Sequence, residues 1–417
     1  MAPLTVDLGE RPVARCDALG EVPYSEEPGL LSRPYLTRAH RMALDELAGW
    51  MTEAGMSVRL DPLGNMIGRY EGLQPGAPAL LIGSHIDTVR NGGRYDGALG
   101  VMLGVECVGA LNRAGRRYGF AIEVIAFGDE EGSRFPASML CSRGVVAPIE
   151  LSALETADAD GVTVGQALVE FGLDPARIAE AARLPGEVFA YVEAHIEQGP
   201  VLESEALPVG VVTGIAAQHR IKIRLTGEAG HAGTTPMDLR RDALAGAAES
   251  ILAIEALCRQ GPQDLRGTVG RIAPKTQAYN VIPGEVELGL DLRAAAETTR
   301  DAACEQIRAK LALIARDRGL QLDFQIIQTL PASPCDAALM RLMNQAVADI
   351  GVRPFELISG AGHDAMVLAR LAPMAMLFIR CAGGVSHNPA ERVAPEDVAV
   401  AGQTMIAFIE RLAAARA

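Results

Sequence analysis

The sequence predicts an α/β protein in which a larger domain is interrupted by a smaller one. After a mostly helical start, with a helix expected at 36–56, two short apolar runs at 79–85 and 121–127 flank a helix-like segment at 101–113. This is the order of a βαβ unit. Both runs end in polar residues, as buried strands do at the edge where parallel sheets bind ligands. Near residue 213 polar and apolar residues begin to alternate, which is typical of half-exposed antiparallel strands.

The segments after this change predict a small sandwich of antiparallel sheet and two helices. Its strand, helix, strand, strand, helix and strand are expected at 220–225, 243–257, 268–272, 285–293, 300–318 and 321–327. Buried α/β patterning returns in a helix at 337–350 and a strand at 375–379. We therefore expect residues 1–212 and 330–417 to form one domain, with residues 213–329 inserted in it.

Composition fits a globular protein of two or three domains: 417 residues, of which 49% are hydrophobic and 22% charged. The formal net charge of −14 and the lack of a basic cluster argue against nucleic acid or an anionic membrane as a partner. No apolar run is long enough to span a bilayer, and the first 17 residues show no signal peptide pattern. Seven scattered cysteines without CxxC spacing fit free thiols in the cytoplasm.

Polar side chains with metal-binding chemistry follow the two apolar runs. His85 and Asp87 share one face of an extended chain, so Asp87 can accept the second ring N–H of a metal-bound His85. Asp96 comes shortly afterwards, and Glu130 and Glu131 follow the second run. Imidazole and carboxylate ligands suit Zn, Mn or Co.

Two more histidines lie in polar motifs, His195 in EAHIEQGP and His387 in SHNPAE. Taken singly, each histidine can be a structural residue, and the paired glutamates can form a solvated turn. Taken together, a bridging aspartate flanked by a carboxylate and several histidines suits a two-metal hydrolase. In such a site the metals polarise a carbonyl and an uncoordinated carboxylate takes a proton from water. Spacing alone leaves both interpretations open.

Eight motifs occur in order along the chain: GSHIDTVRNGGRYDG (83–97), FGDEEGSRFP (127–136), EAHIEQGPVLE (193–203), GHAGTTPM (230–237), NVIPGEV (280–286), DLR (291–293), SGAGHDA (359–365) and SHNPAE (386–391). With them, nearly the whole chain resembles the hydantoinase/carbamoylase group of M20 metallopeptidase-like amidohydrolases. The resemblance implies an M20-type catalytic domain with a mixed sheet and flanking helices, interrupted by a smaller α+β lid and dimerisation domain. It also implies a homodimer.

The same resemblance implies roles for individual residues. Two divalent metal ions, Mn or Zn, would be held by His85, Asp96 and His195 and by Asp96, Glu131 and His387. Glu130 would be the general base, with Asp87 and His231 completing the catalytic set. None of these positions departs from the family pattern.

The substrate contacts implied by the resemblance are Gln198, His231, Asn280, Arg293 and Gly362. The planar fork of Arg293 suits a substrate carboxylate, and His231 could donate to the oxyanion of a tetrahedral intermediate. Without the resemblance, Arg293 could equally form an ion pair with Asp291, and His231 could cap the next helix. Residues of the inserted domain would reach the metals by domain closure or from a partner subunit, with a hinge near 213 and 329.

The activity implied is hydrolysis of the C–N bond of a ureido (N-carbamoyl) group on a small carboxylate, with release of ammonia and carbon dioxide. The stretches FAIEVIAFGDEEGSRFP and SHNPAE are most similar to allantoate amidohydrolases, so allantoate and a place in purine catabolism are expected first. N-carbamoyl-L-amino-acid hydrolases and β-ureidopropionase share nearly all these motifs. An M20 peptidase or aminoacylase is less consistent with Arg293 and HIEQGP.

Two rival functions have less support. A non-catalytic metal-binding homologue would be expected to lack the base or a ligand. A nicotinamide-dependent oxidoreductase would rest only on the GAGHDA stretch (360–365), which matches a dinucleotide fingerprint. This stretch follows no opening βαβ unit, and the acidic residue expected about 20 positions later is lacking. We therefore interpret it as a substrate-facing loop that His363 and Asp364 support. His40 and His219 are expected to be structural.

Overall fold

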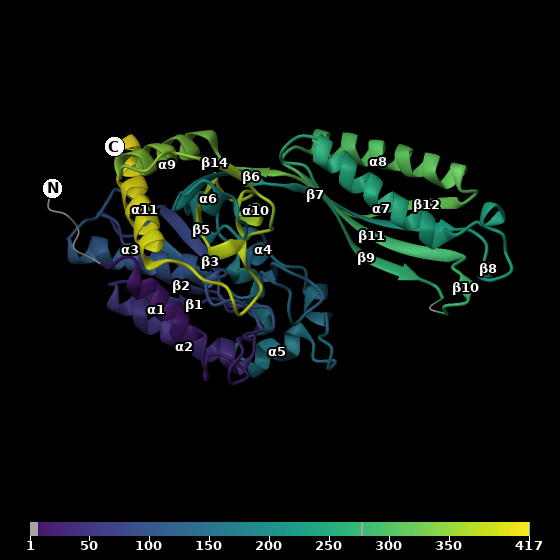
Figure 1. Cartoon of the computed structure of the whole chain (residues 1–417). Helices are drawn as coiled ribbons and strands as arrows, with labels where there is room; N and C mark the ends of the chain where they lie inside the picture. Colours follow the sequence, from purple (N-terminus) through teal and green to yellow (C-terminus); the bar gives the residue numbers. More distant parts are fainter. Residues whose placement is uncertain (1–6, 277, 417) are drawn as a thin grey trace. The chain divides into compact units, whose positions relative to one another are not determined.

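The computed structural model describes residues 7–276 and 278–416. Residues 1–6, part of the segment in which no signal peptide pattern was expected, lie outside the described residues. The chain divides into two compact units (Figure 1). The first unit runs up to Thr213 and resumes at Cys335, and the second is Gly214–Pro334. The boundaries expected from the sequence lie at 213 and 329.

The first unit is built on a mixed sheet whose described strands follow the order β1-β2-β4-β3-β5-β15-β6, with β14 beside β6. The two-residue β13, the last residues of the second unit, pairs with the end of β6 at the boundary between the units. The strands are β1 (Ser57–Leu60), β2 (Met66–Tyr70), β3 (Ala79–His85), β4 (Ala121–Phe127), β5 (Val188–Ile196), β6 (Val209–Ile215), β13 (Ser333–Pro334), β14 (Glu356–Ser359) and β15 (Met374–Ile379). The central strands β4, β3, β5 and β15 are mutually parallel, while β1, β2, β6 and β13 pair antiparallel. The carboxyl ends of the four parallel strands therefore lie along one edge.

Helices surround this sheet. They are α1 (Glu10–Leu19), α2 (Arg38–Glu53), α3 (Ala98–Arg113), α4 (Leu140–Val146), α5 (Val164–Glu170), α6 (Val201–Ser204), α9 (Ala337–Asp349), α10 (Ala365–Leu368) and α11 (Pro395–Arg416), with short 3₁₀ turns η1 (Leu151–Glu155), η2 (Pro175–Ala181) and η4 (Ala382–Gly384). Every residue of β3 and β4 is buried, and α3 packs on both strands. This explains why both strands are apolar along their length rather than alternating.

The structure confirms an α/β fold with a mixed sheet and a smaller α+β part. The apolar runs at 79–85 and 121–127 are the parallel neighbours β3 and β4, joined by α3. Strand β5, which carries His195 and lies between β3 and β15, was not predicted from the sequence.

The last helix, α11, is long and apolar enough to meet a length and composition test for a membrane span, with a mean hydropathy of 1.3 over 18 residues. Half of that stretch is buried inside the structure, where α11 packs against α9, α1 and α3. These contacts are those of a core helix.

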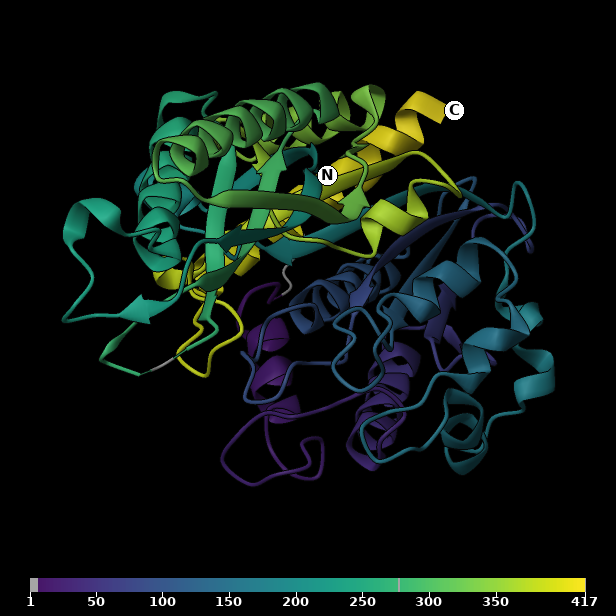
Figure 2. The same ribbon diagram turned by 90° about the vertical axis from the view of Figure 1, so that its right-hand side faces the viewer.

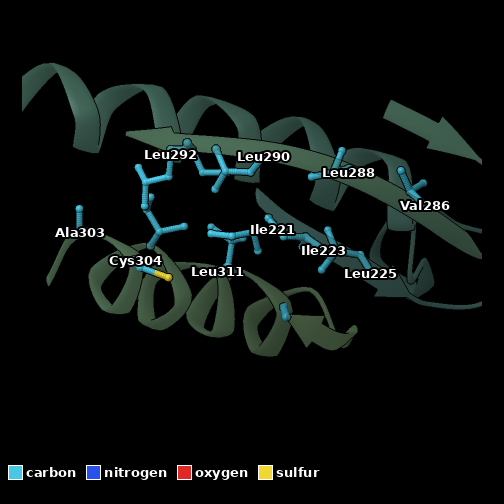
Figure 3. Close-up of a cluster of buried hydrophobic side chains, with 14 of the residues drawn as sticks. Ile221, Ile223, Leu225, Val286, Leu288, Leu290, Leu292, Ala303, Cys304 and Leu311 are labelled. Carbon is cyan, nitrogen blue, oxygen red and sulfur yellow. The ribbon is translucent and has the colours of Figure 1, made fainter. Parts of the chain in front are cut away.

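The second unit is an antiparallel sheet of order β12-β7-β11-β9 with two long helices (Figures 1 and 2). Its elements are β7 (Ala217–Thr226), β8 (Gly230–His231), η3 (Met237–Leu239), α7 (Ala243–Gln260), β9 (Arg266–Pro274), β10 (Val281–Ile282), β11 (Glu285–Ala294), α8 (Glu297–Asp317) and β12 (Gln321–Leu330). Alternate residues of β7 and β11 are buried, and they pack with residues of α7 and α8 into one apolar core (Figure 3). The period-two pattern of the sequence is thus explained by one covered face. The small β8–β10 pair was not predicted.

His40 is a structural histidine, as expected. Its ring is buried in α2, accepts the Leu36 N–H at Nδ1 (3.1 Å) and stacks on Phe171 at 5.4 Å. Its Nε2 has no hydrogen-bond partner among the described residues. Burial lowers the pKa of His40 to about 3.

This pKa predicts a loss of stability in mild acid. Between pH 6.5 and 3 the unfolded chain binds a proton on His40 that the folded chain does not, so the folded state is destabilised as the pH falls. We expect the free energy of unfolding to fall by about 2 kcal/mol more in the wild type than in His40→Gln between pH 6.5 and 4.5. Urea unfolding of the metal-free proteins at both pH values measures this difference. Equal losses would show that the folded state also protonates His40.

Candidate metal centre

The candidate site lies at the carboxyl edge of the parallel strands of the first unit. β3 ends at His85, which pairs in register with Phe127 at the end of β4, immediately before the loop with Glu130 and Glu131. His195 is the penultimate residue of β5 and pairs in register with Phe378 of β15. Parallel pairing therefore brings together side chains that are far apart in the sequence.

Asp96, in the loop before α3, lies at the centre of these side chains. Its Oδ1 is 3.2 Å from Nε2 of His195 and 3.9 Å from Nε2 of His85. Its Oδ2 is 3.0 Å from Nε2 of His387, and this same nitrogen is 3.5 Å from Oε1 of Glu131. One carboxylate thus faces three imidazoles with its two oxygens.

The donor atoms form compact groups that suit divalent metal ions. Within each group they lie within 4.8 Å of one another, and the groups relevant here are His85, Asp96 and His195; Asp96, Glu131 and His387; and His85, Glu130 and Glu131. Mixed imidazole and carboxylate donors match Zn or Mn chemistry. The first two groups share Asp96, as the ligand sets implied by the resemblance do.

Hydrogen bonds to backbone carbonyls fix two of the histidine rings. Nδ1 of His195 lies 2.8 Å from the carbonyl oxygen of Ile196, and Nδ1 of His85 lies 3.0 Å from the carbonyl oxygen of Asp87. A carbonyl oxygen only accepts, so each Nδ1 carries the hydrogen. When the ring is neutral, Nε2 presents its lone pair toward Asp96, which is the tautomer that a metal ligand needs. Although burial opposes it, hydrogen bonds to Asp87 and Asp96 raise the pKa of His85 and His195, so in the metal-free protein Nε2 of His195 can carry a second proton and donate to Asp96.

Asp87 acts differently from the simple expectation. Its carboxylate oxygen is 3.5 Å from Nδ1 of His85, farther than its own backbone oxygen. Instead, the carboxylate accepts the backbone N–H groups of Glu130 (3.1 Å) and Glu131 (3.2 Å). Asp87 therefore orients the loop that carries both glutamates, besides lying next to the His85 ring.

Gly97 is required by the close approach of His85. Its φ of +67° lies in the left-handed region, and a Cβ there would lie 2.4 Å from the imidazole ring. The residue directly after Asp96 must therefore be a glycine for His85 to face the same carboxylate.

Burial and charge shift the pKa values of the site in opposite directions. Burial raises the pKa of Glu130 well above its ordinary value, against the opposing effect of His85, and raises that of Glu131 to about 7. Burial would also raise the pKa of Asp96, but hydrogen bonds from His195 and His387 hold it well below its usual range. The site therefore keeps one carboxylate ionised at its centre and places two carboxyl groups that hold protons readily beside it.

The side chain of Gln198 lies against this central carboxylate. Its amide donates to both oxygens of Asp96, at 3.1 and 3.0 Å. Both Gln198 (φ +56°) and His387 (φ +53°) have left-handed backbones, which are uncommon for residues with a side chain. Gly362 also lies next to the candidate site, since a Cβ at Gly362 would lie 4.0 Å from Oε1 of Glu130.

The other expected substrate contacts lie in the second unit. There β8 and β10 bring His231 beside Asn280, whose carbonyl accepts the Ala232 N–H at 2.9 Å. Arg293 lies on β11 and forms a bidentate pair with Asp291 at 2.7 and 3.1 Å, the alternative left open by the sequence.

The capping alternative for His231 is wrong. Nδ1 of His231 accepts the Gly233 N–H, and Asp242 caps α7.

The GAGHDA stretch (360–365) forms a loop and does not have the structure of a dinucleotide-binding motif. It follows β14, and the helix that begins at its last residue, α10, has only four residues. Nε2 of His363 lies 2.8 Å from the Ser359 hydroxyl, and the His363 ring is 4.5 Å from that of His195. His363 thus buttresses a predicted ligand.

Sequence reasoning missed Ser386 and Glu391, although both stand in the SHNPAE motif. The Ser386 hydroxyl lies 2.8 Å from Oδ2 of Asp96, and Glu391 accepts the Asp96 N–H. Their presence in the same motif as His387 was the one signal in the sequence that pointed to a role for them at this site.

Comparisons with known proteins show what this chain is similar to. The sequence model of "Peptidase family M20/M25/M40" matches residues 81–411. An N-carbamoyl-L-amino acid amidohydrolase of Geobacillus stearothermophilus is 43% identical over 97% of this chain and 98% of that protein. An allantoate deiminase of Arabidopsis thaliana is 38% identical over 97% of this chain and 82% of that protein. The crystal structure of a hydantoinase/carbamoylase family amidase from Burkholderia ambifaria has a TM-score of 0.89 and 36% identity, over 96% of both chains.

Proposed function

We propose that this chain, which belongs to peptidase family M20/M25/M40 and to its hydantoinase/carbamoylase group of amidohydrolases, hydrolyses the ureido group of a small carboxylate. The observation that carries the proposal is Asp96, whose two oxygens face separate sets of imidazole and carboxylate donors with Glu130 beside them. Such a bridging carboxylate is what a two-metal hydrolase requires.

The proposed cofactors are two divalent metal ions, Mn or Zn. The first would be held by His85, Asp96 and His195, and the second by Asp96, Glu131 and His387. Ions bound there would polarise the carbonyl oxygen of the ureido group and lower the pKa of a water molecule. The donor types and the fixed tautomers of His85 and His195 support this assignment.

Glu130 is the proposed general base. The Asp87 carboxylate holds its backbone, and burial raises its pKa, so it can hold a proton between two steps. Glu130 would take a proton as water adds to the carbamoyl carbon and pass it to the nitrogen that leaves when the C–N bond breaks. The carbamate produced then yields ammonia and carbon dioxide.

Substrate recognition is proposed for Gln198 and Gly362 in the first unit and for His231, Asn280 and Arg293 in the second. Arg293 would exchange its pair with Asp291 for the substrate carboxylate, which a planar guanidinium binds bidentately. His231 would donate to the oxyanion. A homodimer and motion about hinges near 213 and 329 complete the proposal. The seven free cysteines support a reducing, cytoplasmic location.

Two substrates have specific support. The relative with 43% identity is an N-carbamoyl-L-amino acid amidohydrolase, which favours N-carbamoyl-L-amino acids. Allantoate, the first expectation from the sequence, is supported by the motifs and by the 38% identical allantoate deiminase. We place N-carbamoyl-L-amino acids first because that relative is both more similar and covered along nearly its whole length.

The Glu130→Gln variant tests the base. Removing the proton acceptor while keeping the shape should lower kcat by about 10²–10⁴-fold. Metal content, measured by plasma emission spectrometry, should stay at the wild-type level because Glu130 belongs to neither proposed ligand set. Glu131→Gln is the neighbouring control. Because Glu131 is a proposed ligand, this variant should lower both kcat and metal content. A Glu130→Gln protein with wild-type turnover would refute the assignment.

A substrate panel tests the reaction. The manganese-loaded protein should release ammonia from N-carbamoyl-L-amino acids or from allantoate, and should leave N-acetyl-L-amino acids and dipeptides intact. Faster release from allantoate would move the chain to allantoate deiminase function with the same site assignments. Cleavage of the N-acetyl or dipeptide controls alone would contradict a ureido hydrolase.

A further inference from the structure

Glu391 is a buried carboxylate to which no role has been assigned so far. Only 1% of its surface is exposed. Its Oε1 accepts the backbone N–H groups of Tyr95 (2.8 Å) and Asp96 (3.1 Å), and its Oε2 lies 3.0 Å from the Ser386 hydroxyl. One side chain therefore holds two loops whose sequence positions differ by almost 300 residues.

Both loops carry proposed metal ligands, and they also contact each other at the carboxylate of Asp96. The Ser386 hydroxyl lies 2.8 Å from Oδ2 of Asp96, and Nε2 of the next residue, His387, lies 3.0 Å from the same oxygen. Glu391 thus holds the backbone of Asp96 and, through Ser386, the chain entering His387. The position of His387 relative to Asp96 depends on this connection.

Local structure shapes the pocket for this carboxylate. The Glu391 N–H donates to the Asn388 carbonyl, and this turn directs the side chain back toward Ser386. Gly93 makes room on the other side, because a Cβ there would lie 2.0 Å from the carboxyl carbon of Glu391. Any side chain at Gly93 would displace the carboxylate.

We propose that Glu391 is a positioning residue that fixes Asp96 and His387 relative to each other and so sets the affinity for the metal ion these two would share. The proposal rests on the proposed two-metal function. Glu391 does not contact a proposed ligand atom, and it acts through a backbone N–H and the Ser386 hydroxyl. Carboxylates of this kind, one layer behind the ligands, change metal affinity by about 10–100-fold when removed.

A purely structural role is the alternative, and Asp61 is the matched control for it. Asp61 is also 1% exposed and also accepts two backbone N–H groups, of Leu63 and Asn65, and one side-chain donor, of Asn65. None of these partners adjoins a proposed ligand in the sequence. Asp61→Ala should therefore cost stability without altering metal affinity.

The experiment is calorimetric titration of the metal-free proteins with MnCl₂, together with thermal unfolding of the same samples. Glu391→Ala should weaken the site that includes His387 by at least tenfold, whereas Asp61→Ala should bind manganese like the wild type. Glu391→Gln keeps an oxygen that can accept both backbone N–H groups and should recover most of the affinity. Gly93→Ala, which displaces the carboxylate without removing it, should weaken binding as Glu391→Ala does.

Three results would overturn the proposal: wild-type affinity in both Glu391→Ala and Gly93→Ala, an equal loss in Asp61→Ala, or no recovery in Glu391→Gln. The last would show that charge rather than hydrogen bonding sets the affinity. If Glu391→Ala does not fold, the Gly93→Ala and Glu391→Gln pair decides the question. A wild-type protein that binds neither manganese nor, in a parallel titration, zinc would refute the proposed function itself, which is a separate outcome.

Discussion

The carboxylate of Asp96 must face imidazoles that come from three different parts of the chain, and much of the first unit is arranged to meet this requirement. Parallel pairing places the ends of β3 and β5 at one edge, so His85 and His195 arrive from adjacent strands. Gly97 gives the His85 ring space. His387 arrives on a loop after β15 that hydrogen bonds tie back to Asp96. Ligands usually bind at this edge of an α/β sheet, and here the edge also gathers the proton-accepting groups.

Burial of several carboxylates in one place is costly unless hydrogen bonds or cations compensate it. The carboxylates of Asp87 and Glu391 each accept backbone N–H groups. They therefore fix the loops that carry the proposed metal ligands and are not metal ligands themselves. Asp96 is held by imidazoles. Glu130 accepts no side-chain hydrogen bond in the part of the chain that the structure describes, and its pKa is raised by burial. These different surroundings allow adjacent or similar acidic residues to have different roles.

The sequence predicted the elements whose signal is local. β3 and β4 are unbroken apolar runs, and β7 and β11 alternate, so their burial could be predicted from periodicity alone. Strand β5 was not predicted, although it is buried along nearly its whole length. The hydrogen bonds that join Gln198 and Glu391 to Asp96 could not be predicted, because they form across long sequence separations. Motif resemblance named the ligand candidates, but only three-dimensional packing shows what holds them.

The central claim is that Asp96 bridges two metal ions. Anomalous diffraction from crystals soaked in MnCl₂, recorded near the manganese absorption edge, tests it most directly. The account predicts two peaks, one between Asp96, His85 and His195 and the other between Asp96, Glu131 and His387. A single peak that does not touch Asp96, or one held by Glu193, His195 and His363, the other buried donor group of this region, would contradict it.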